Sequence, residues 1–178
     1  MDFLEHTLNW TRGEIFESTL IGAAGGILLA LAILFARYGN GPGGRAVVMP
    51  LVVLGLIFLG SGLWQVRVNQ NREIAFQQAH DLNPTAFVHT EKLRVEAFYP
   101  IYVQVRVGAT LCFALALVLL WLARAHWLHA AALGLLILGS SALVIDYFSK
   151  ERADAYYQVI LRAEEASSSA VDMPCWWC

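Results

Sequence analysis

Charged residues are scarce in this sequence, and four long stretches contain none. They make up 15% of the 178 residues, whereas an ordinary soluble domain contains about 25%. The uncharged stretches lie between these pairs of charges: Glu17 and Arg37, Arg45 and Arg67, Arg106 and Arg124, Arg124 and Asp146. Each approaches the roughly 20 residues that a helix needs to cross a hydrocarbon core of about 30 Å. This scarcity excludes a soluble globular domain and predicts an all-α membrane protein, a bundle of four transmembrane helices.

The sequence also lacks the basic surface of a nucleic-acid-binding protein. Its net charge is −2, and no stripe of Lys and Arg is interleaved with aromatic residues, so we expect no nucleic-acid partner. The amino-terminal segment "MDFLEHTLNWTRGEIFE" contains four acidic residues and one Arg. A secretory signal peptide begins with positive charge instead, so the sequence predicts no cleaved signal.

Cysteine is rare, with Cys112 inside an uncharged stretch and Cys175 and Cys178 in the segment "CWWC". The CxxC spacing occurs in redox dithiols and in half of a zinc site. A redox dithiol normally has its first Cys at the start of a helix, and a zinc site needs two further ligands. Neither feature is evident here. We therefore predict no metal and no cofactor, and any redox or metal role of the pair stays open.

Motifs of catalysis and of phosphate binding are missing as well. The segment "YGNGPGGR" is rich in glycine, but it lacks the Gly-Lys-Ser/Thr ending of a phosphate-binding loop, and no strand precedes it. Glycine and proline favour chain reversal, so this segment is predicted to be a turn between two spans. No nucleophile–base pair or haem-type His pair is apparent.

The uncharged stretches place the spans at about 18–37, 46–66, 101–123 and 127–147, within a single membrane domain of residues 18–165. Residues 1–17 are predicted to form an amphipathic helix lying at the bilayer interface, where Trp10 suits the headgroup region. An irregular segment leading into the first span is the alternative. Residues 166–178 are polar and without periodicity, which predicts a disordered tail.

Residues 67–100 are predicted to form a helical hairpin that caps one face of the bundle. No Gly or Pro interrupts the sequence from the second span to about His80, so the span helix continues outward. The segment "DLNP" then ends it, because a residue before proline avoids the helical region. Asn83 caps a second helix over 84–98 with Pro84 at its first position, and Pro100 begins the third span.

The helical pattern of the fourth span also continues beyond the membrane. Ala153, Tyr156, Tyr157 and Ile160 recur at helical spacing, and this face is predicted to pack on the hairpin.

Small residues recur every four positions in the first span. They are Ser18, Gly22, Gly26 and Ala30. Such a stripe lets two helices approach closely within a bilayer. We predict that it packs against the second or fourth span of the same chain, and homo-oligomerisation through the stripe is the alternative.

Four charges occur at one level of the bundle, on the face that holds the hairpin: Arg106, Asp146, Arg67 and Glu17. An ionisable side chain inside a span is costly unless it reaches water or a partner. We therefore predict an ion pair between Arg106 and Asp146. A ligand or ion site at this level, and independently solvated charges, remain alternatives.

A second polar cluster is predicted on the cap, where His89, Glu91 and Arg94 are close in sequence. Helical spacing places Glu91 and Arg94 on one face, which is typical of a surface ion pair. A metal site would need His89 and carboxylates from another helix to converge.

Basic residues indicate the orientation. The face with both termini and the hairpin contains nine of the twelve Lys and Arg residues, although it also contains all fourteen acidic residues. The positive-inside rule counts Lys and Arg and gives acidic residues little weight. Both termini are therefore predicted to be cytoplasmic.

The favoured function is a non-catalytic binding, accessory or assembly protein of the bacterial inner membrane. Arg outnumbers Lys by ten to two and Ala and Leu dominate the spans, which is typical of GC-rich bacterial genomes. The expected partners are the lipid bilayer and either another protein or further copies of the chain. A small homo-oligomeric channel or transporter is one alternative, and a membrane enzyme acting on a lipid or quinone is another.

Overall fold

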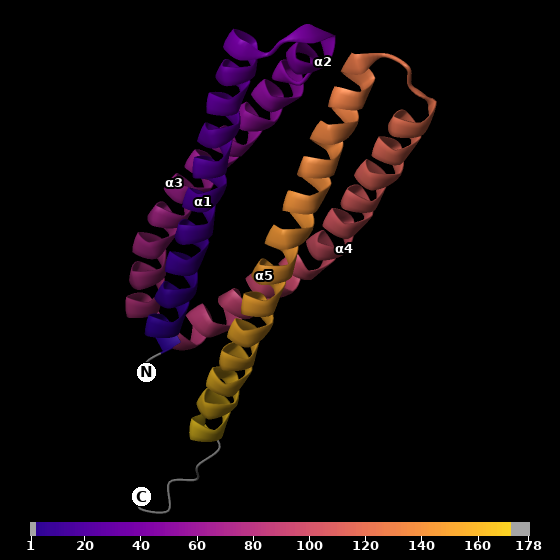
Figure 1. The fold of residues 1–178 in the computed structure, drawn as a ribbon. Helices are drawn as coiled ribbons and strands as arrows, with labels where there is room; N and C mark the ends of the chain where they lie inside the picture. Colours follow the sequence, from indigo (N-terminus) through magenta and orange to yellow (C-terminus); the bar gives the residue numbers. More distant parts are fainter. Residues whose placement is uncertain (1–2, 172–178) are drawn as a thin grey trace, which may run out of the picture.

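A computed structural model describes the backbone of residues 3–171 and the side chains of residues 3–165 (Figure 1). The described chain is helical apart from its turns, and the helices are α1 (Phe3–Tyr38), α2 (Gly41–Ala46), α3 (Val48–Leu82), α4 (Pro84–Leu122) and α5 (His126–Val171). Each of the four long helices has the length and hydropathy to cross a membrane. The predicted all-α, multi-pass four-helix bundle is therefore confirmed.

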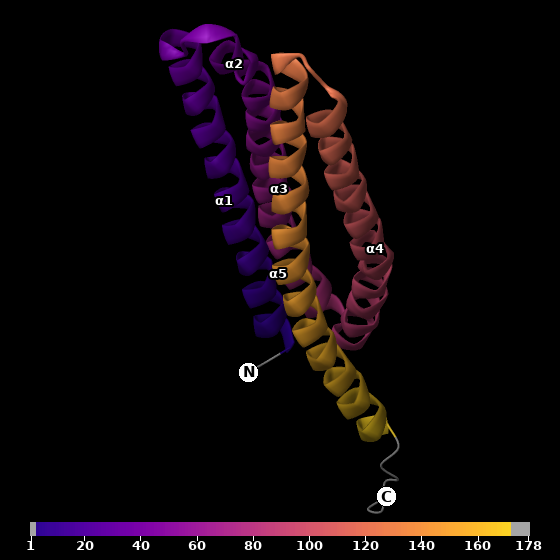
Figure 2. The same ribbon diagram turned by 45° about the vertical axis from the view of Figure 1, so that its right-hand side comes forward.

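The four long helices form two antiparallel pairs. α1 packs along α3, and α4 packs along α5, with far fewer contacts between the pairs (Figures 1 and 2). At one end lie the short α2 and the turn between α4 and α5. At the other end lie the α3–α4 turn, the start of α1 and the extension of α5, which together form the cap.

The α3–α4 turn follows the prediction made from "DLNP". Asn83 has an extended backbone with φ −159°. Its side-chain oxygen accepts a hydrogen bond of 3.1 Å from the amide nitrogen of Ala86, and its own amide donates to the carbonyl of Ala79. One residue thus ends α3 and caps α4, because its side chain satisfies an amide left free in the first turn.

Pro100 does not begin a new helix, contrary to the prediction of separate helices over 84–98 and 101–123. It lies inside α4, which runs unbroken for 39 residues. Proline removes one backbone hydrogen bond and bends a helix without necessarily ending it. α4 bends between its cap portion and its span (Figure 1). One continuous helix therefore connects the cap to the third span.

The separate interfacial helix predicted for residues 1–17 is also replaced, because α1 is continuous from Phe3 to Tyr38. Thr7 and Thr11 are fully buried. The ring of Trp10 stacks on that of Tyr156, with centroids 5.1 Å apart. Phe3 and Trp10 of this segment therefore pack inside the cap, whereas Phe16 is 64% exposed. The amphipathic pattern alone does not distinguish these two apolar environments.

Small residues bring α1 and α3 into close contact within the spans. A Cβ atom on Gly62 would lie 2.6 Å from the carbonyl oxygen of Ser18 and 2.5 Å from the amide nitrogen of Gly22. A Cβ atom on Gly25 would lie 2.8 Å from the carbonyl oxygen of Gly55. The predicted packing within the chain is thus observed at Ser18 and Gly22.

The predicted packing within the chain is wrong for the other two residues of the stripe, Gly26 and Ala30. No heavy atom outside the local helix lies within 4 Å of a Cβ built on Gly26, and Ala30 is exposed. An α-helix has 3.6 residues per turn, so a strict four-residue repeat drifts by about 40° at each step. The observed contact face advances by four residues and then by three, through Gly22 and Gly25, as in left-handed helix pairs.

The turn between α1 and α3 includes α2, where a tight loop was predicted. Gly41 begins α2 with φ +82°, a conformation that glycine adopts without steric cost. At the carboxyl end, α5 continues to Val171, so the disordered tail predicted from residue 166 is wrong for 166–171. Residues 172–178, with the CWWC segment, lie outside the described residues.

The cap has its own buried core. Val88, Val95, Tyr156 and Ile160 form it, with partly buried aromatic residues around them. The face predicted from the helical spacing of Tyr156 and Ile160 therefore packs on α4, as expected. This core holds the cap portions of α1, α4 and α5 against the boundary of the spans.

Candidate functional site

A cavity of about 410 Å³ lies where the spans meet the cap, and all four long helices contribute to its wall. The walls are mainly apolar, with a few polar groups among them. The lining residues are Trp10, Glu14, Gln65, Val95, Phe98, Ile101, Tyr102, Val105, Ala142, Ile145, Asp146, Ser149 and Ala153. Gln65 and Ile101 are exposed and mark its mouth. We refer to this space as the boundary cavity.

Asp146 is the most buried acidic group of the boundary cavity. Its side chain is 4% exposed, and its Oδ2 accepts a hydrogen bond of 3.1 Å from Nε of Arg106. Its Oδ1 is buried and accepts no hydrogen bond from the residues that the structure describes. The predicted Arg106–Asp146 pair is confirmed, and it satisfies only one of the two carboxylate oxygens.

Arg106 approaches this pair from outside the boundary cavity. Its side chain is 52% exposed, and it is not among the lining residues. An arginine near a span end extends its guanidinium toward water while its stem stays in apolar surroundings. The side chain of Arg106 is thus about half exposed, whereas the carboxylate that it holds is buried.

Glu14 provides the second carboxylate, one turn before the first span. Burial raises the pKa of Glu14, while the nearby Arg94, Arg72 and Arg152 oppose the rise and Glu17 adds to it. The closest of these ion contacts joins Oε2 of Glu14 to Nη1 of Arg72 at 4.0 Å.

The charges that line the boundary cavity have one sign. Glu14 and Asp146 are lining residues, and no Lys or Arg is among the residues that form the wall. Arg72 and Arg106 reach the two carboxylates from behind the wall. The charged groups that an occupant of the cavity would contact directly are therefore carboxylates.

Three further polar residues line the cavity. The hydroxyl of Tyr102 on α4 lies 3.4 Å from both the carbonyl oxygen and the Oγ of Ser149 on α5. Gln65 of α3 contributes an amide at the mouth. The wall thus combines apolar surface with a few converging polar groups, which is the composition typical of small-molecule sites.

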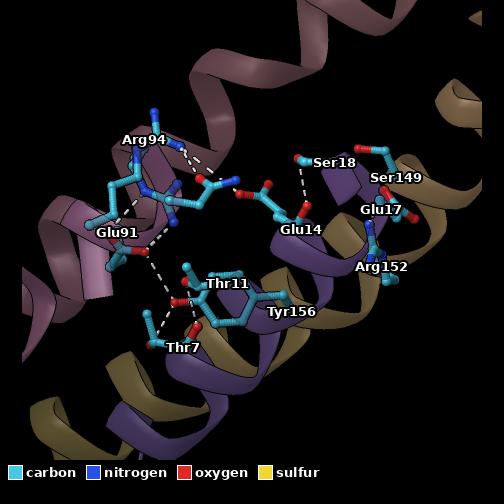
Figure 3. Close-up of polar contacts among 12 residues, drawn as sticks. Thr7, Thr11, Glu14, Glu17, Ser18, Glu91, Arg94, Ser149, Arg152 and Tyr156 are labelled. Carbon is cyan, nitrogen blue, oxygen red and sulfur yellow. Dashed lines mark hydrogen bonds and ion pairs between the residues drawn. The ribbon is translucent and has the colours of Figure 1, made fainter. Parts of the chain in front are cut away.

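The remaining members of the predicted polar layer lie elsewhere. Glu17 forms an ion pair with Arg152 of α5 (Figure 3), outside the boundary cavity. Arg67 is exposed and takes part in no ion pair among the described residues. Only Arg106 and Asp146 of the four predicted charges therefore meet.

The Glu17–Arg152 pair closes one end of a lateral groove between the two helix pairs. This groove has a volume of about 740 Å³ and is lined by α1, α3 and α5. Its walls are apolar apart from the ion pair and two hydroxyls, from Ser140 and Ser141. Ile145 lines both spaces, so the groove and the boundary cavity adjoin at α5.

The predicted cap cluster is only partly assembled. Nε and Nη2 of Arg94 donate hydrogen bonds of 3.0 and 2.6 Å to the two carboxylate oxygens of Glu91, so the ion pair forms as predicted. It is not a surface pair, however, because the Glu91 side chain is 2% exposed. His89 is exposed, and therefore does not join the buried Glu91 in a metal or catalytic group.

The guanidinium of Arg94 is enclosed by aromatic rings. It lies 4.6 Å from the ring centroid of Trp10 on α1 and 5.1 Å from that of Phe76 on α3. A cation over an aromatic face is attracted by the ring quadrupole, more strongly where water is excluded. Arg94 thereby connects the cap portions of three helices.

A chain of hydroxyl groups extends this ion pair to α1 and α5 (Figure 3). The Tyr156 hydroxyl donates a hydrogen bond of 3.1 Å to Oε2 of Glu91 and lies 2.7 Å from Oγ1 of Thr7. Tyr156 has one hydroxyl proton, which it donates to Glu91. The hydroxyl of Thr7 also donates a hydrogen bond of 3.1 Å to the carbonyl oxygen of Phe3. Burial and the neighbouring Glu91 raise the pKa of Tyr156, which keeps this phenol protonated.

No group of three or more His, Cys, Asp and Glu residues within the described part of the chain is placed to hold a metal ion. Cys112 is a free, half-buried thiol. The paired Cys175 and Cys178 lie outside the described residues.

Sequence reasoning did not identify the cavity itself, or Gln65, Tyr102 and Ser149 as members of one site. These residues come from α3, α4 and α5, and no spacing pattern connects them. The sequence did indicate Asp146 and Arg106, because both are charged residues near the end of a predicted span.

Comparison with known proteins gives no relative from which a function can be transferred. No protein-family model, no curated protein and no solved structure matches the chain.

Proposed function

We propose that the chain is a non-catalytic, membrane-embedded binding protein whose ligand site is the boundary cavity. The observation that carries this proposal is the buried Asp146 carboxylate. One of its oxygens is without a partner among the described residues, in the wall of a cavity formed by four helices. A buried acceptor that makes no hydrogen bond costs about 1–3 kcal/mol, and a ligand or water that donates to it removes that cost.

The composition of the wall supports a small amphiphilic ligand. A volume of about 410 Å³ lies within the range of about 300–1,000 Å³ that is usual for small-molecule sites. Phe98 and Ile101 provide apolar surface, and Gln65 lies at the mouth. Arginines approach the carboxylates of both Glu14 and Asp146.

The proposed location is the bacterial inner membrane with both termini in the cytoplasm. The support is the count of Lys and Arg, nine against three between the two faces. In this orientation the boundary cavity lies at the cytoplasmic side of the bilayer. Fusions of a reporter that is active only in the cytoplasm test the orientation. Activity of the fusion at Val171 and inactivity at Gly43 are expected, and the reverse pattern would overturn it.

A cavity-filling variant tests the binding site. The protein in lipid nanodiscs is titrated with propylbenzene and with 2-phenylethylammonium, and saturable binding is measured by NMR saturation transfer after subtraction of empty nanodiscs. Ala142→Phe places a ring in the boundary cavity. Val144→Phe, two residues along α5, faces the lateral groove instead and is the matched control.

We expect at least one probe to bind the wild-type protein and the Val144→Phe variant saturably, and Ala142→Phe to lose that binding. Circular dichroism and size-exclusion chromatography check that both variants fold. Absence of saturable binding of either probe to wild type, or equal binding to the Ala142→Phe variant, would remove the basis of the proposal.

A further inference from the structure

The carboxylate oxygen of Asp146 that lacks a partner identifies the kind of group that the boundary cavity accommodates. Oδ1 is an acceptor only, because an ionised carboxylate has no proton to donate. Its complement is therefore an N–H or O–H donor. Rotation about the terminal torsion of an aspartate is soft and nearly two-fold. Exchange of the two oxygens by this rotation leaves one of them on Arg106 and the other without a partner among the described residues.

The sign of the charge on the lining residues selects among donors. Asp146 and Glu14 both line the wall, and no basic residue does. Arg106 is half-exposed, and the arginines around Glu14, namely Arg72, Arg94 and Arg152, are also absent from the lining. A hydrogen bond from a charged donor to a carboxylate is shorter and about twice as strong as one between neutral groups. A cationic nitrogen therefore gains more here than a hydroxyl.

The remaining walls suit the apolar part of such a ligand. Phe98, Ile101 and Val105 of α4 face Ala142 and Ile145 of α5 across the space. A free inorganic cation would leave these apolar walls uncontacted. An organic ammonium with an attached hydrocarbon or aromatic group would contact both the Asp146 carboxylate and the apolar walls.

We propose that the boundary cavity binds a primary ammonium group joined to an apolar moiety, with the ammonium on the carboxylate of Asp146. This inference rests on the proposed function and names the ligand class of the same site. The ammonium could belong to a free amine or to the headgroup of an aminophospholipid, because both present the same –NH₃⁺ donor.

A pair of nearly isosteric probes tests the charge requirement without any mutation. 2-Phenylethylammonium and propylbenzene differ in that –NH₃⁺ replaces a methyl group. Both are titrated against the wild-type protein in nanodiscs of phosphatidylglycerol and phosphatidylcholine, lipids that contain no primary ammonium. A charged hydrogen bond to a buried carboxylate is lost when a methyl group takes the place of the ammonium, so we expect the ammonium to bind at least about tenfold more tightly.

Two variants locate the preference. Asp146→Asn keeps the shape of the side chain and removes its charge, and it is expected to reduce the preference for the ammonium to less than about threefold. Glu73→Gln removes an acidic group that pairs with Arg12 outside the cavity, and should leave the preference unchanged. Retention of the preference in Asp146→Asn would overturn the assignment, and its loss in Glu73→Gln would do the same.

The two sources of the ammonium are separated by lipid composition. If phosphatidylethanolamine in the nanodisc competes with 2-phenylethylammonium, the site accepts the lipid headgroup. If it does not compete, the site is specific for a free amine, and both results support an ammonium site. Equal binding of the two probes overturns this inference and leaves the proposed function standing. Absence of binding by both probes overturns the two together.

Discussion

The hydroxyl groups of Thr7 and Tyr156 lie 2.7 Å apart although 149 residues separate them in sequence. This contact joins the first turns of α1 to the cap portion of α5. Tyr156 passes the hydrogen bond on to the buried Glu91 of α4. The cap is therefore fastened by a polar chain that crosses three helices, inside a core that also contains Val95 and Ile160.

Removal of the Tyr156 hydroxyl is expected to destabilise the protein. Tyr156→Phe deprives Glu91 and Thr7 of a buried partner, and the loss should be about 1–3 kcal/mol of unfolding free energy. Tyr157→Phe is the matched control, because the Tyr157 hydroxyl donates to Glu96 at the exposed surface. Its loss should stay within about 0.5 kcal/mol. Equilibrium unfolding in mixed detergent micelles measures both, and equal losses would contradict the structural role of Tyr156.

The pairing of α1 with α3 gives a second prediction, at two adjacent glycines. A Cβ atom on Gly25 would meet the amide nitrogen of Leu59 and lie 2.9 Å from its Cα, whereas one on Gly26 meets nothing within 4 Å. Gly25→Ala forces the helices apart and is expected to lower the unfolding free energy by about 1–3 kcal/mol. Gly26→Ala should be neutral or stabilising by up to about 1 kcal/mol. Comparable destabilisation by both would show that α1 packs in another register.

The ion pair at the boundary cavity gives a third prediction. Arg106→Gln leaves the buried Asp146 carboxylate without its cationic partner, so we expect a loss of about 1–3 kcal/mol in unfolding free energy. Arg67→Gln changes an exposed arginine near the end of a neighbouring span and should cost less than about 0.5 kcal/mol. The same micelle unfolding experiment compares them. A loss at Arg67 that equals the loss at Arg106 would indicate that general charge, and not this pair, stabilises the bundle.

The features predicted from the sequence are those that depend on local chemistry. Uncharged stretches predicted the spans, because a bilayer has no water to satisfy charges or free backbone groups. "DLNP" predicted the α3–α4 turn, since proline restricts its own residue and the one before it. The Arg106–Asp146 pair followed from the cost of an isolated charge near a span end.

The features that the sequence did not reveal depend on how helices meet. The register of α1 on α3 passes through Gly25 and not Gly26, and both residues are glycine, so composition cannot distinguish them. The amino-terminal segment has an apolar face that suits a bilayer surface and a protein core equally well. The burial of Glu91 depends on Trp10, Phe76 and Tyr156 from three other helices, and no local pattern contains that information.

The last prediction concerns the pH dependence of stability that Glu14 introduces. Burial raises its pKa above the ordinary value of 4.5, so the folded protein tolerates the neutral acid better than the carboxylate. A group with a raised folded-state pKa contributes stability that is fully present below the unfolded pKa. That contribution is lost as the pH rises through the folded value. Glu14→Gln has a neutral side chain of similar shape at every pH and lacks this loss.

Wild type should therefore lose stability relative to the Glu14→Gln variant as the pH rises from about 4 to about 7. The measurement is the difference between the two unfolding free energies at each pH, in the same micelles and at constant ionic strength. Taking the difference cancels the titration of groups common to both proteins, while Arg72, Arg94 and Arg152 stay charged throughout this range. A constant difference, or one that favours wild type at the higher pH, would show that the arginines outweigh burial at Glu14. The boundary cavity would then hold this group as a stabilised carboxylate.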